Sequence, residues 1–140
     1  MARAIGGLSM GAWGALYQAF THPDIFGVVG AHSPSLYPDD NNLQFLGVGA
    51  EFASKDPTSL ARMIPRLDTL HIWMDVSEND PWLDATIGLH NVLAQRGVLH
   101  EWHVNPGYHA SVYWAQHIPE YLTFYGHALA GQPARQSAKS

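Results

Sequence analysis

Short, almost continuous apolar runs alternate along the chain with stretches rich in good helix formers. Continuous apolar runs are typical of parallel strands that are buried on both faces. Strands that alternate with helices predict an α/β fold, with a parallel sheet of about four strands and helices on both of its faces. The pattern predicts strands at residues 2–8, 25–32, 70–76 and 98–104, and helices at residues 12–20, 57–63, 82–96 and 111–128.

Glycine and proline mark the ends of several of these elements. Pro23 follows the first predicted helix, and Gly97 suits the end of another because glycine adopts the left-handed conformation that closes a helix. Turn-forming residues make 33–65 a connection with some helix. Residues 131–140 are small and polar, which is typical of a disordered tail. We therefore expect one domain at residues 1–130, followed by that tail.

Composition restricts the classes of function. With 140 residues, 46% of them hydrophobic, the chain is long enough for one core. The net charge is −5 and there is no basic run, so neither nucleic acid nor a membrane surface is an expected partner. No apolar run reaches the ~18 residues of a membrane span, and the sequence as given shows no signal peptide, so we expect a soluble, cytoplasmic chain. The absence of cysteine excludes disulfides and a cysteine nucleophile.

The segment Gly7-Leu8-Ser9-Met10-Gly11 lies between the first predicted strand and the first predicted helix. It fits Gly-x-Ser-x-Gly, in which glycines permit a sharp turn that exposes a serine hydroxyl at the carboxyl edge of a sheet. A glycine-rich turn before a helix can also be purely structural, or can bind phosphate. Its position between strand and helix favours Ser9 as a nucleophile, with the Met10 amide placed to donate to an oxyanion.

A serine nucleophile needs a base, and the base needs a group that orients it. Asp80 follows the third predicted strand, and His109 closes a loop predicted at residues 105–109, after the fourth. The order Ser, Asp, His is one of the known orders of a catalytic triad. Asp80 also stands where a helix cap is expected, and Glu78 and Asp75 are alternative carboxylates.

Nine histidines raise the question of a metal site. The chain has no His-Glu-x-x-His pair, and the spacing of His100 and His103 places their rings on opposite faces of a strand, so we expect no metal. The aromatic residues near the last helix are more typical of helix packing than of a ligand site. Tyr108 and Trp114 lie closest to His109 in the sequence and are expected to border a substrate pocket.

Four segments of the chain resemble one family of enzymes. Residues 3–16 (Arg-Ala-Ile-Gly-Gly-Leu-Ser-Met-Gly-Ala-Trp-Gly-Ala-Leu) are similar to the nucleophile segment of an esterase family of α/β-hydrolases. That family includes S-formylglutathione hydrolases, feruloyl and acetyl-xylan esterases, enterochelin esterases and mycolyltransferases. The resemblance continues through residues 26–34 and 75–80 and ends at residues 107–114, so it covers nearly all of the chain except the tail.

The resemblance implies a three-layer α/β-hydrolase fold and hydrolysis of carboxylic esters through an acyl-enzyme, without a cofactor. It implies Ser9 as the nucleophile, His109 as the base and then the acid, and Asp80 as the orienting carboxylate. We expect a small acyl ester as substrate, because the chain offers little pocket wall. Transfer of the acyl group to an alcohol or sugar uses the same triad and stays open. Ala12 replaces a second glycine that is usual in the family.

The resemblance also implies that only the C-terminal half of the family fold is present. The other half supplies a loop with a second oxyanion donor, and the loss of one such donor lowers a rate by about 10²-fold. The first strand would then have an uncovered apolar edge, so we expect a homodimer or higher oligomer in which a second chain covers it. The alternative is a catalytically weak or inactive hydrolase fragment that serves as an association module or as half of a split enzyme.

Overall fold

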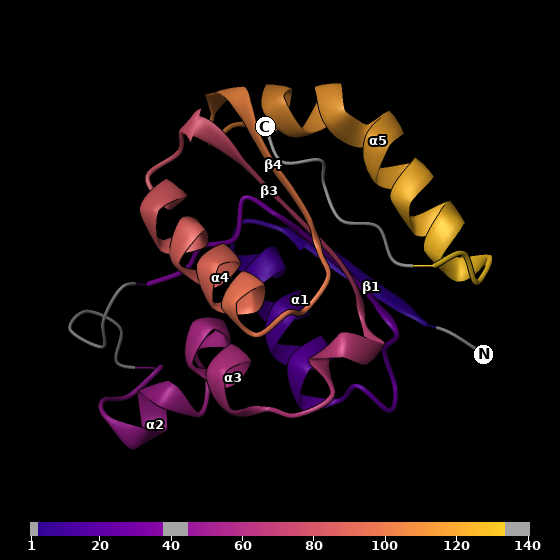
Figure 1. The fold of residues 1–140 in the computed structure, drawn as a ribbon. Coiled ribbons are helices and arrows are strands. Elements are labelled where there is room, and N and C mark those ends of the chain that lie inside the picture. Colours follow the sequence, from indigo (N-terminus) through magenta and orange to yellow (C-terminus); the bar gives the residue numbers. More distant parts are fainter. Residues whose placement is uncertain (1–2, 38–44, 134–140) are drawn as a thin grey trace.

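The structure, a computed structural model, describes residues 3–37 and 45–133. Four parallel strands form one sheet in the order β1-β2-β3-β4, and a helical connection joins each strand to the next (Figure 1). The elements in chain order are β1 (Ala4–Leu8), α1 (Met10–Thr21), β2 (Val28–His32), α2 (Ala50–Ala53), α3 (Pro57–Met63), a 3₁₀ turn (Leu67–Thr69), β3 (His71–Asn79), α4 (Leu83–Gln95), β4 (Glu101–Tyr108) and α5 (Ser111–Leu129).

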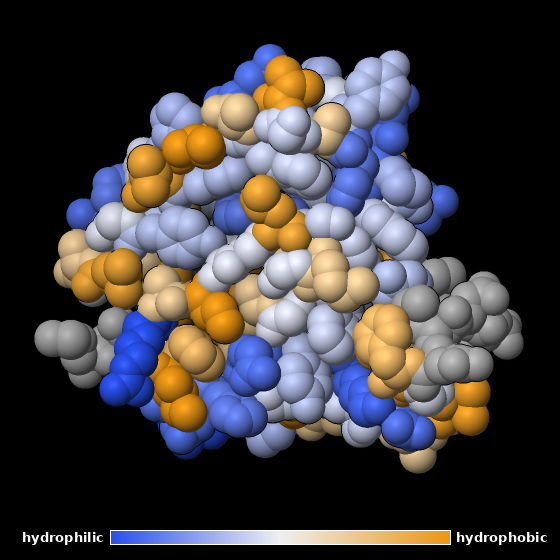
Figure 2. Space-filling view, turned by 180° about the vertical axis from the view of Figure 1, so that it is seen from behind, coloured by the Kyte–Doolittle hydropathy of each residue, from blue (hydrophilic) through white to orange (hydrophobic). Residues whose placement is uncertain are grey.

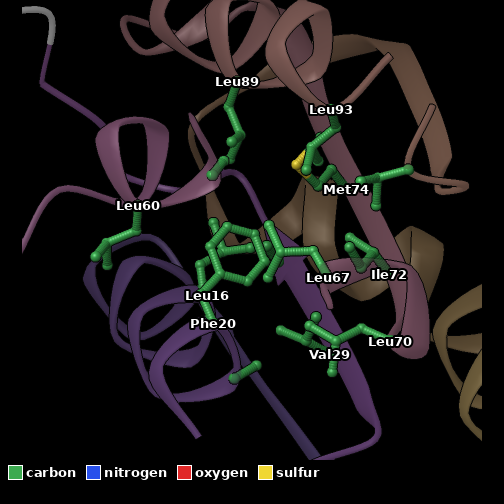
Figure 3. Packing of buried hydrophobic residues seen from close by; sticks show 14 of the residues in the cluster. Leu16, Phe20, Val29, Leu60, Leu67, Leu70, Ile72, Met74, Leu89 and Leu93 are labelled. Atoms are coloured by element: carbon green, nitrogen blue, oxygen red, sulfur yellow. The ribbon is translucent and has the colours of Figure 1, made fainter. Parts of the chain in front are cut away.

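Helices cover both faces of the sheet, as the alternation of strands and helices predicts. On one face, side chains of α1, α3 and α4 converge on β2 and β3, with Leu16 and Leu89 among those fully buried (Figure 3). On the other face, Phe124 of α5 packs against Trp73 of β3. Full burial of such a side chain contributes about 1.5–3 kcal/mol to stability. The chain therefore has the three-layer arrangement of a truncated α/β fold.

Two strands begin later than their apolar runs suggest. The amide of Ile25 donates to the carbonyl of His22, which forms a turn and delays β2 until Val28. The amide of Val98 likewise donates to a carbonyl of α4, so β4 begins only at Glu101. In both places apolar residues already pack before the strand begins. A run of apolar residues therefore does not show by itself where the strand starts.

The loop predicted at residues 105–109 is instead mostly strand, because β4 continues to Tyr108. Proline cannot donate to a strand ladder and is confined to edges and bulges. Pro106 satisfies this rule, since β4 ends the described sheet and its register with β3 shifts between Ser77 and Asn79. The bulge accommodates Pro106, so the end of β4 stays beside the end of β3.

Some sequence-based predictions fall outside the described residues. These are the turns expected within residues 38–44 and most of the tail, of which only residues 131–133 are described. The short helix α2 was not predicted, whereas α3 coincides with the helix expected at residues 57–63. Within the two described ranges, no helix combines the length and apolar character needed to cross a membrane.

Ser77, on β3, provides a test of packing in this sheet. Its side chain is fully buried, and its hydroxyl has no hydrogen-bond partner within the described part of the chain. Burial of an unpaired hydroxyl costs free energy that a methyl group does not. We expect Ser77→Ala to raise the free energy of unfolding by about 1 kcal/mol, measured by urea denaturation. A loss of stability in Ser77→Ala would show that the hydroxyl has a partner.

Candidate active site

Ser9 occupies a tight turn between β1 and α1. Its backbone has φ 56° and ψ −119°, a conformation that a residue other than glycine adopts only when its surroundings impose it. The Ser9 amide donates to the carbonyl of His32 (3.0 Å), and the amide of Ser35 donates to the carbonyl of Ser9 (3.2 Å). These two bonds fix the turn at the carboxyl ends of β1 and β2.

The two glycines that flank Ser9 differ in their surroundings. A Cβ atom at Gly7 would lie 2.4 Å from the backbone carbon and oxygen of Gly11, because α1 folds back closely over the end of β1. A Cβ atom at Gly11 would meet nothing within 4 Å in the described residues. The turn therefore requires the first glycine of the pentapeptide but not the second.

This difference predicts opposite effects of two alanine substitutions. Gly7→Ala is expected to lower the free energy of unfolding by more than about 2 kcal/mol, because two backbone segments must move apart. Gly11→Ala, the matched control, is expected to raise it by up to about 1 kcal/mol, because alanine is the better helix former. Urea denaturation of both variants measures the difference. Equal losses in both would mean that the second glycine is also required.

The structure brings together the three residues that the sequence singles out. The Oγ atom of Ser9 lies 2.8 Å from Nε2 of His109, and Nδ1 of His109 lies 2.8 Å from Oδ2 of Asp80. The Asp80 side chain is completely buried, whereas that of His109 is 22% exposed. The other carboxylate oxygen of Asp80 accepts from the amide of Trp82 (2.9 Å). Asp80 is thus both the partner of His109 and a cap of the turn before α4.

These contacts fix the direction of each hydrogen bond. An ionised carboxylate only accepts, so Nδ1 of His109 carries the proton that it shares with Asp80. Nε2 of His109 then has a free lone pair and accepts from the hydroxyl of Ser9. The alternative carboxylates are placed elsewhere: Glu78 is exposed, and Asp75 is buried in a different network.

Three further predicted residues surround this group. Met10 is the first residue of α1, so the helix itself makes no use of its amide, which remains able to donate. The ring of Trp114 stands nearly perpendicular to that of His109 at 5.1 Å, and its indole nitrogen donates to Oγ of Ser33 (3.1 Å). Tyr108 is 68% exposed at the end of β4. Trp114 therefore packs against the imidazole, while Tyr108 lies open to solvent.

Ser35 is a neighbour of Ser9 that the sequence analysis missed. It lies in the turn after β2 and is buried, with its Oγ atom 3.0 Å from Oγ of Ser9. No motif marks Ser33-Pro34-Ser35, but a usable signal exists. The segment follows a fully buried parallel strand, and the carboxyl ends of such strands share one edge of the sheet.

A second polar network, also missed, lies on the α5 side of the sheet. Oδ1 of Asp75 accepts from Nδ1 of His32 (2.7 Å) and from the Trp73 indole (2.8 Å). Its other oxygen accepts from the hydroxyls of Tyr113 (2.8 Å) and Tyr121 (2.7 Å). Asp75 is fully buried, so four donors replace the water that this carboxylate would otherwise bind. The network ties α5 to β2 and β3.

The pKa of Asp75 reflects two opposing influences. Burial would raise it, but hydrogen bonds from His32, Tyr121 and Trp73, with the electrostatic attraction of His32, hold the pKa of this carboxyl below its ordinary value. Burial, followed by the nearby Asp75 charge, raises the pKa of Tyr113 and of Tyr121 well above the usual range. Both tyrosines therefore keep their protons and act as donors.

Three of the other histidines lie on different sides of the sheet. Nδ1 of His90, on α4, lies 2.7 Å from Nε2 of His100, whereas the ring of His103 stacks on Trp73 on the α5 side. Burial lowers the pKa of His90 and of His100, and the neighbouring His100 lowers that of His90 further. Among the described residues, no three potential ligands are grouped so that they could hold a metal ion.

A family model described as "Putative esterase" matches residues 1–125. The chain belongs to that esterase family. Comparison with curated proteins gives no match. Solved structures do resemble this esterase-family chain, among them esterases and S-formylglutathione hydrolases of which the matching part is about half. The chain spans about half the length of these relatives, with a covered share of 50% in the first of them.

A ferulic acid esterase is 26% identical, with a TM-score of 0.75 over 87% of this chain and 50% of its own. The S-formylglutathione hydrolase of Staphylococcus aureus is 24% identical, with a TM-score of 0.65 over 86% and 49%. That of Agrobacterium tumefaciens is 18% identical, with a TM-score of 0.75 over 90% and 49%. The fold of this esterase-family chain is therefore that of the α/β-hydrolases, truncated to four strands.

Proposed function

We propose that this chain carries the reacting residues of a serine-dependent carboxylic ester hydrolase that works through an acyl-enzyme. The observation that carries the proposal is the continuous relay of 2.8 Å hydrogen bonds from Ser9 to His109 and from His109 to Asp80. It combines a hydroxyl on a strained turn, a base with its lone pair facing that hydroxyl, and a buried carboxylate that fixes the tautomer of the base. Membership of the esterase family gives independent support.

In the first step, the oxygen of Ser9 attacks the ester carbonyl carbon while its proton passes to Nε2 of His109. The carbonyl electron pair moves to the oxygen, and the Met10 amide, at the positive end of α1, donates to the resulting oxyanion. When the tetrahedral intermediate collapses, the bond to the alcohol oxygen breaks. That oxygen takes the proton from His109, which leaves the acyl group on Ser9.

In the second step, water attacks the acyl carbon and gives a proton to Nε2 of His109. Collapse of the second intermediate breaks the bond to Ser9, and His109 returns the proton to the serine oxygen. Asp80 stabilises the imidazolium in both halves of the reaction and keeps its own charge. An alcohol in place of water would give acyl transfer through the same steps.

The surroundings of Ser9 support a small acyl ester as the substrate. Leu8 and Met10 are each nearly half exposed beside Ser9, and Tyr108 is largely exposed at the end of β4, next to His109 in the chain. An open site selects weakly, because specificity depends on enclosing a ligand in a pocket with a few fixed polar groups. We propose that p-nitrophenyl acetate, with its short acyl group and good leaving group, reacts faster than its longer-chain homologues.

The proposal is tested by incubation with a fluorophosphonate probe and with p-nitrophenyl acetate. Intact-mass analysis should show one added phosphonyl group, and peptide mapping should place it on Ser9. Release of p-nitrophenol should fall in proportion to labelling. A folded protein that takes up no probe and releases no p-nitrophenol would exclude the esterase function and favour a non-catalytic module.

We also propose that a second copy of the chain covers β1. This strand ends the described sheet, and a hollow of about 440 Å³ runs along it, lined by residues 4–7 and by Ile118, Leu122 and Tyr125 of α5. Ile118 is 49% and Leu122 66% exposed. Apolar patches interrupt the polar surface of the molecule when it is viewed from behind (Figure 2). A two-fold axis would pair identical edges and bury both copies of these residues.

Light scattering after size-exclusion chromatography should therefore give a dimer or higher oligomer. Leu122→Lys is expected to shift the protein toward the monomer, because it places a charge in the hollow. Leu99→Lys, at a similarly exposed apolar residue just before β4, is the matched control and should leave the mass unchanged. A monomeric unmodified chain would exclude the homo-oligomer and leave a partner of different sequence, as in a split enzyme.

A further inference from the structure

Ser35 holds Ser9 through both its backbone and its side chain. The amide of Ser35 donates to the carbonyl of Ser9 (3.2 Å), and the two hydroxyl oxygens are 3.0 Å apart. Ser35 is 4% exposed, so few alternative partners are open to its hydroxyl. It lies in the turn after β2, on a different element from any member of the triad.

The number of protons decides which hydroxyl donates. Ser9 has a single hydroxyl proton, and the lone pair on Nε2 of His109 accepts it at 2.8 Å. The bond between the two serines therefore needs the proton of Ser35. The contact is directional: Ser35 donates to Ser9, and Ser9 donates to His109.

We propose that Ser35 is a further catalytic residue, whose hydroxyl stabilises the Ser9 oxygen during its attack. The inference rests on the proposed esterase function. As the proton of Ser9 moves to His109 and the bond from Oγ to the acyl carbon forms, negative charge passes through Oγ. The proton of Ser35 stays on its own oxygen throughout, so no further reactant is needed.

The benefit of this bond is largest while the charge develops. Hydrogen bonds to an ionised oxygen are about twice as strong as those between neutral groups. In the acyl-enzyme the same oxygen belongs to an ester and accepts weakly. An interaction that strengthens only in the transition state accelerates the chemical step.

The turn that carries Ser35 is held in place before any substrate arrives. The amide of Ser33 donates to the carbonyl of Asp75 (2.8 Å), and its hydroxyl accepts from Trp114. Ser33 itself has a positive φ of 51°, a second imposed backbone conformation two residues from Ser35. A donor fixed in this way needs no reorganisation during the reaction.

The experiment compares the rate of phosphonylation by a fluorophosphonate, and kcat and KM for p-nitrophenyl acetate, in four variants. Ser35→Ala removes the donor and should slow both labelling and kcat about tenfold, with KM nearly unchanged. Ser35→Thr keeps a hydroxyl and should restore most of the rate. Ser35→Cys keeps nearly the same volume with a weak donor and should be slow even if the alanine variant does not fold. Ser77→Ala is the control for the loss of a buried hydroxyl away from the triad.

Two results would overturn the inference. If Ser35→Ala or Ser35→Cys is folded and labelled as fast as the unmodified chain, the Ser35 hydroxyl does not act on Ser9, while the esterase function stands. If the unmodified chain is folded and takes up no probe, both the function and the role of Ser35 are lost. The inference is supported if labelling and turnover are slow in Ser35→Ala, largely restored in Ser35→Thr and unchanged in Ser77→Ala.

Discussion

Ser9→Ala is expected to abolish both covalent labelling by a fluorophosphonate and hydrolysis of p-nitrophenyl acetate. The bond between His109 and Asp80 remains in this variant, but His109 has no serine oxygen to activate. Loss of a triad serine removes nearly all of the chemistry that the three residues perform together, and we expect at least ~10³-fold lower turnover. Intact-mass analysis and release of p-nitrophenol measure the two effects.

The control for this prediction is stability. Alanine tolerates the imposed backbone of residue 9 no better and no worse than serine, so urea denaturation should show a loss of only about 1 kcal/mol, from the buried Ser35 hydroxyl that loses its partner. Ser77→Ala, a buried serine outside the triad, should retain full labelling. Undiminished labelling of Ser9→Ala would mean that another residue is the nucleophile and would falsify the proposed role of Ser9.

The meeting of Ser9, Asp80 and His109 could be predicted from the sequence because each residue follows from a local rule. The pentapeptide around Ser9 specifies a strand-to-helix turn, and its first glycine proves sterically necessary. Asp80 and His109 were placed by their positions after two successive buried strands, whose carboxyl ends meet at one edge of a sheet. An error of a few residues in where β4 begins and ends did not move His109 away from that edge.

Contacts between distant segments could not be predicted in this way. Ser35 and Ser9 are 26 residues apart, and nothing in Ser-Pro-Ser specifies which hydroxyl it will meet. The partners of Asp75 come from β2, β3 and α5, and the choice among several aspartates depends on packing that no local pattern encodes. The boundaries of β2 and β4 also depended on individual hydrogen bonds, which override the apolar runs.

The buried network around Asp75 links the fold to the site. Tyr113, one of its donors, lies four residues after His109, at the start of α5. The carbonyl of Asp75 also accepts from the amide of Ser33, in the turn that carries Ser35. Asp75 therefore anchors two segments: its carboxylate holds the helix that follows His109, and its backbone carbonyl holds the turn beside Ser9. Its expected contribution is to stability, with the chemistry left to Ser9, His109 and Asp80.

We therefore expect Asp75→Asn to lower the stability of the fold and to leave the reaction at Ser9 unchanged. The amide group keeps one acceptor oxygen and turns an NH₂ toward two buried donors, which leaves them unpaired. We expect the free energy of unfolding to fall by about 3–5 kcal/mol and Tm by about 10–20 °C. The fraction that remains folded should still take up the fluorophosphonate.

Asp80→Asn is the matched control for Asp75→Asn, because Asp80 is also buried but accepts, among the described residues, from only the ring of His109 and one backbone amide. Asp80→Asn should lose less stability than Asp75→Asn. Its turnover should fall roughly 10³–10⁴-fold, because the asparagine favours the wrong tautomer of His109. The reverse pattern, with Asp75→Asn inactive but stable, would make Asp75 a member of the reacting group.

The lowered pKa of Asp75 also gives its stabilisation a pH dependence of known sign. A carboxyl whose pKa is lower in the folded protein than its ordinary value of 3.8 binds protons more readily when the chain is unfolded. Its ionisation thus contributes full stability above about pH 4, and this contribution is lost as the pH falls through the lower folded value. Urea denaturation across this range gives the difference in the free energy of unfolding between the unmodified chain and Asp75→Asn. This difference should be constant near neutral pH and should become smaller below about pH 4. A difference that stays constant through acid pH would mean that the charge of Asp75 adds nothing to stability, and that the loss in Asp75→Asn comes from packing alone.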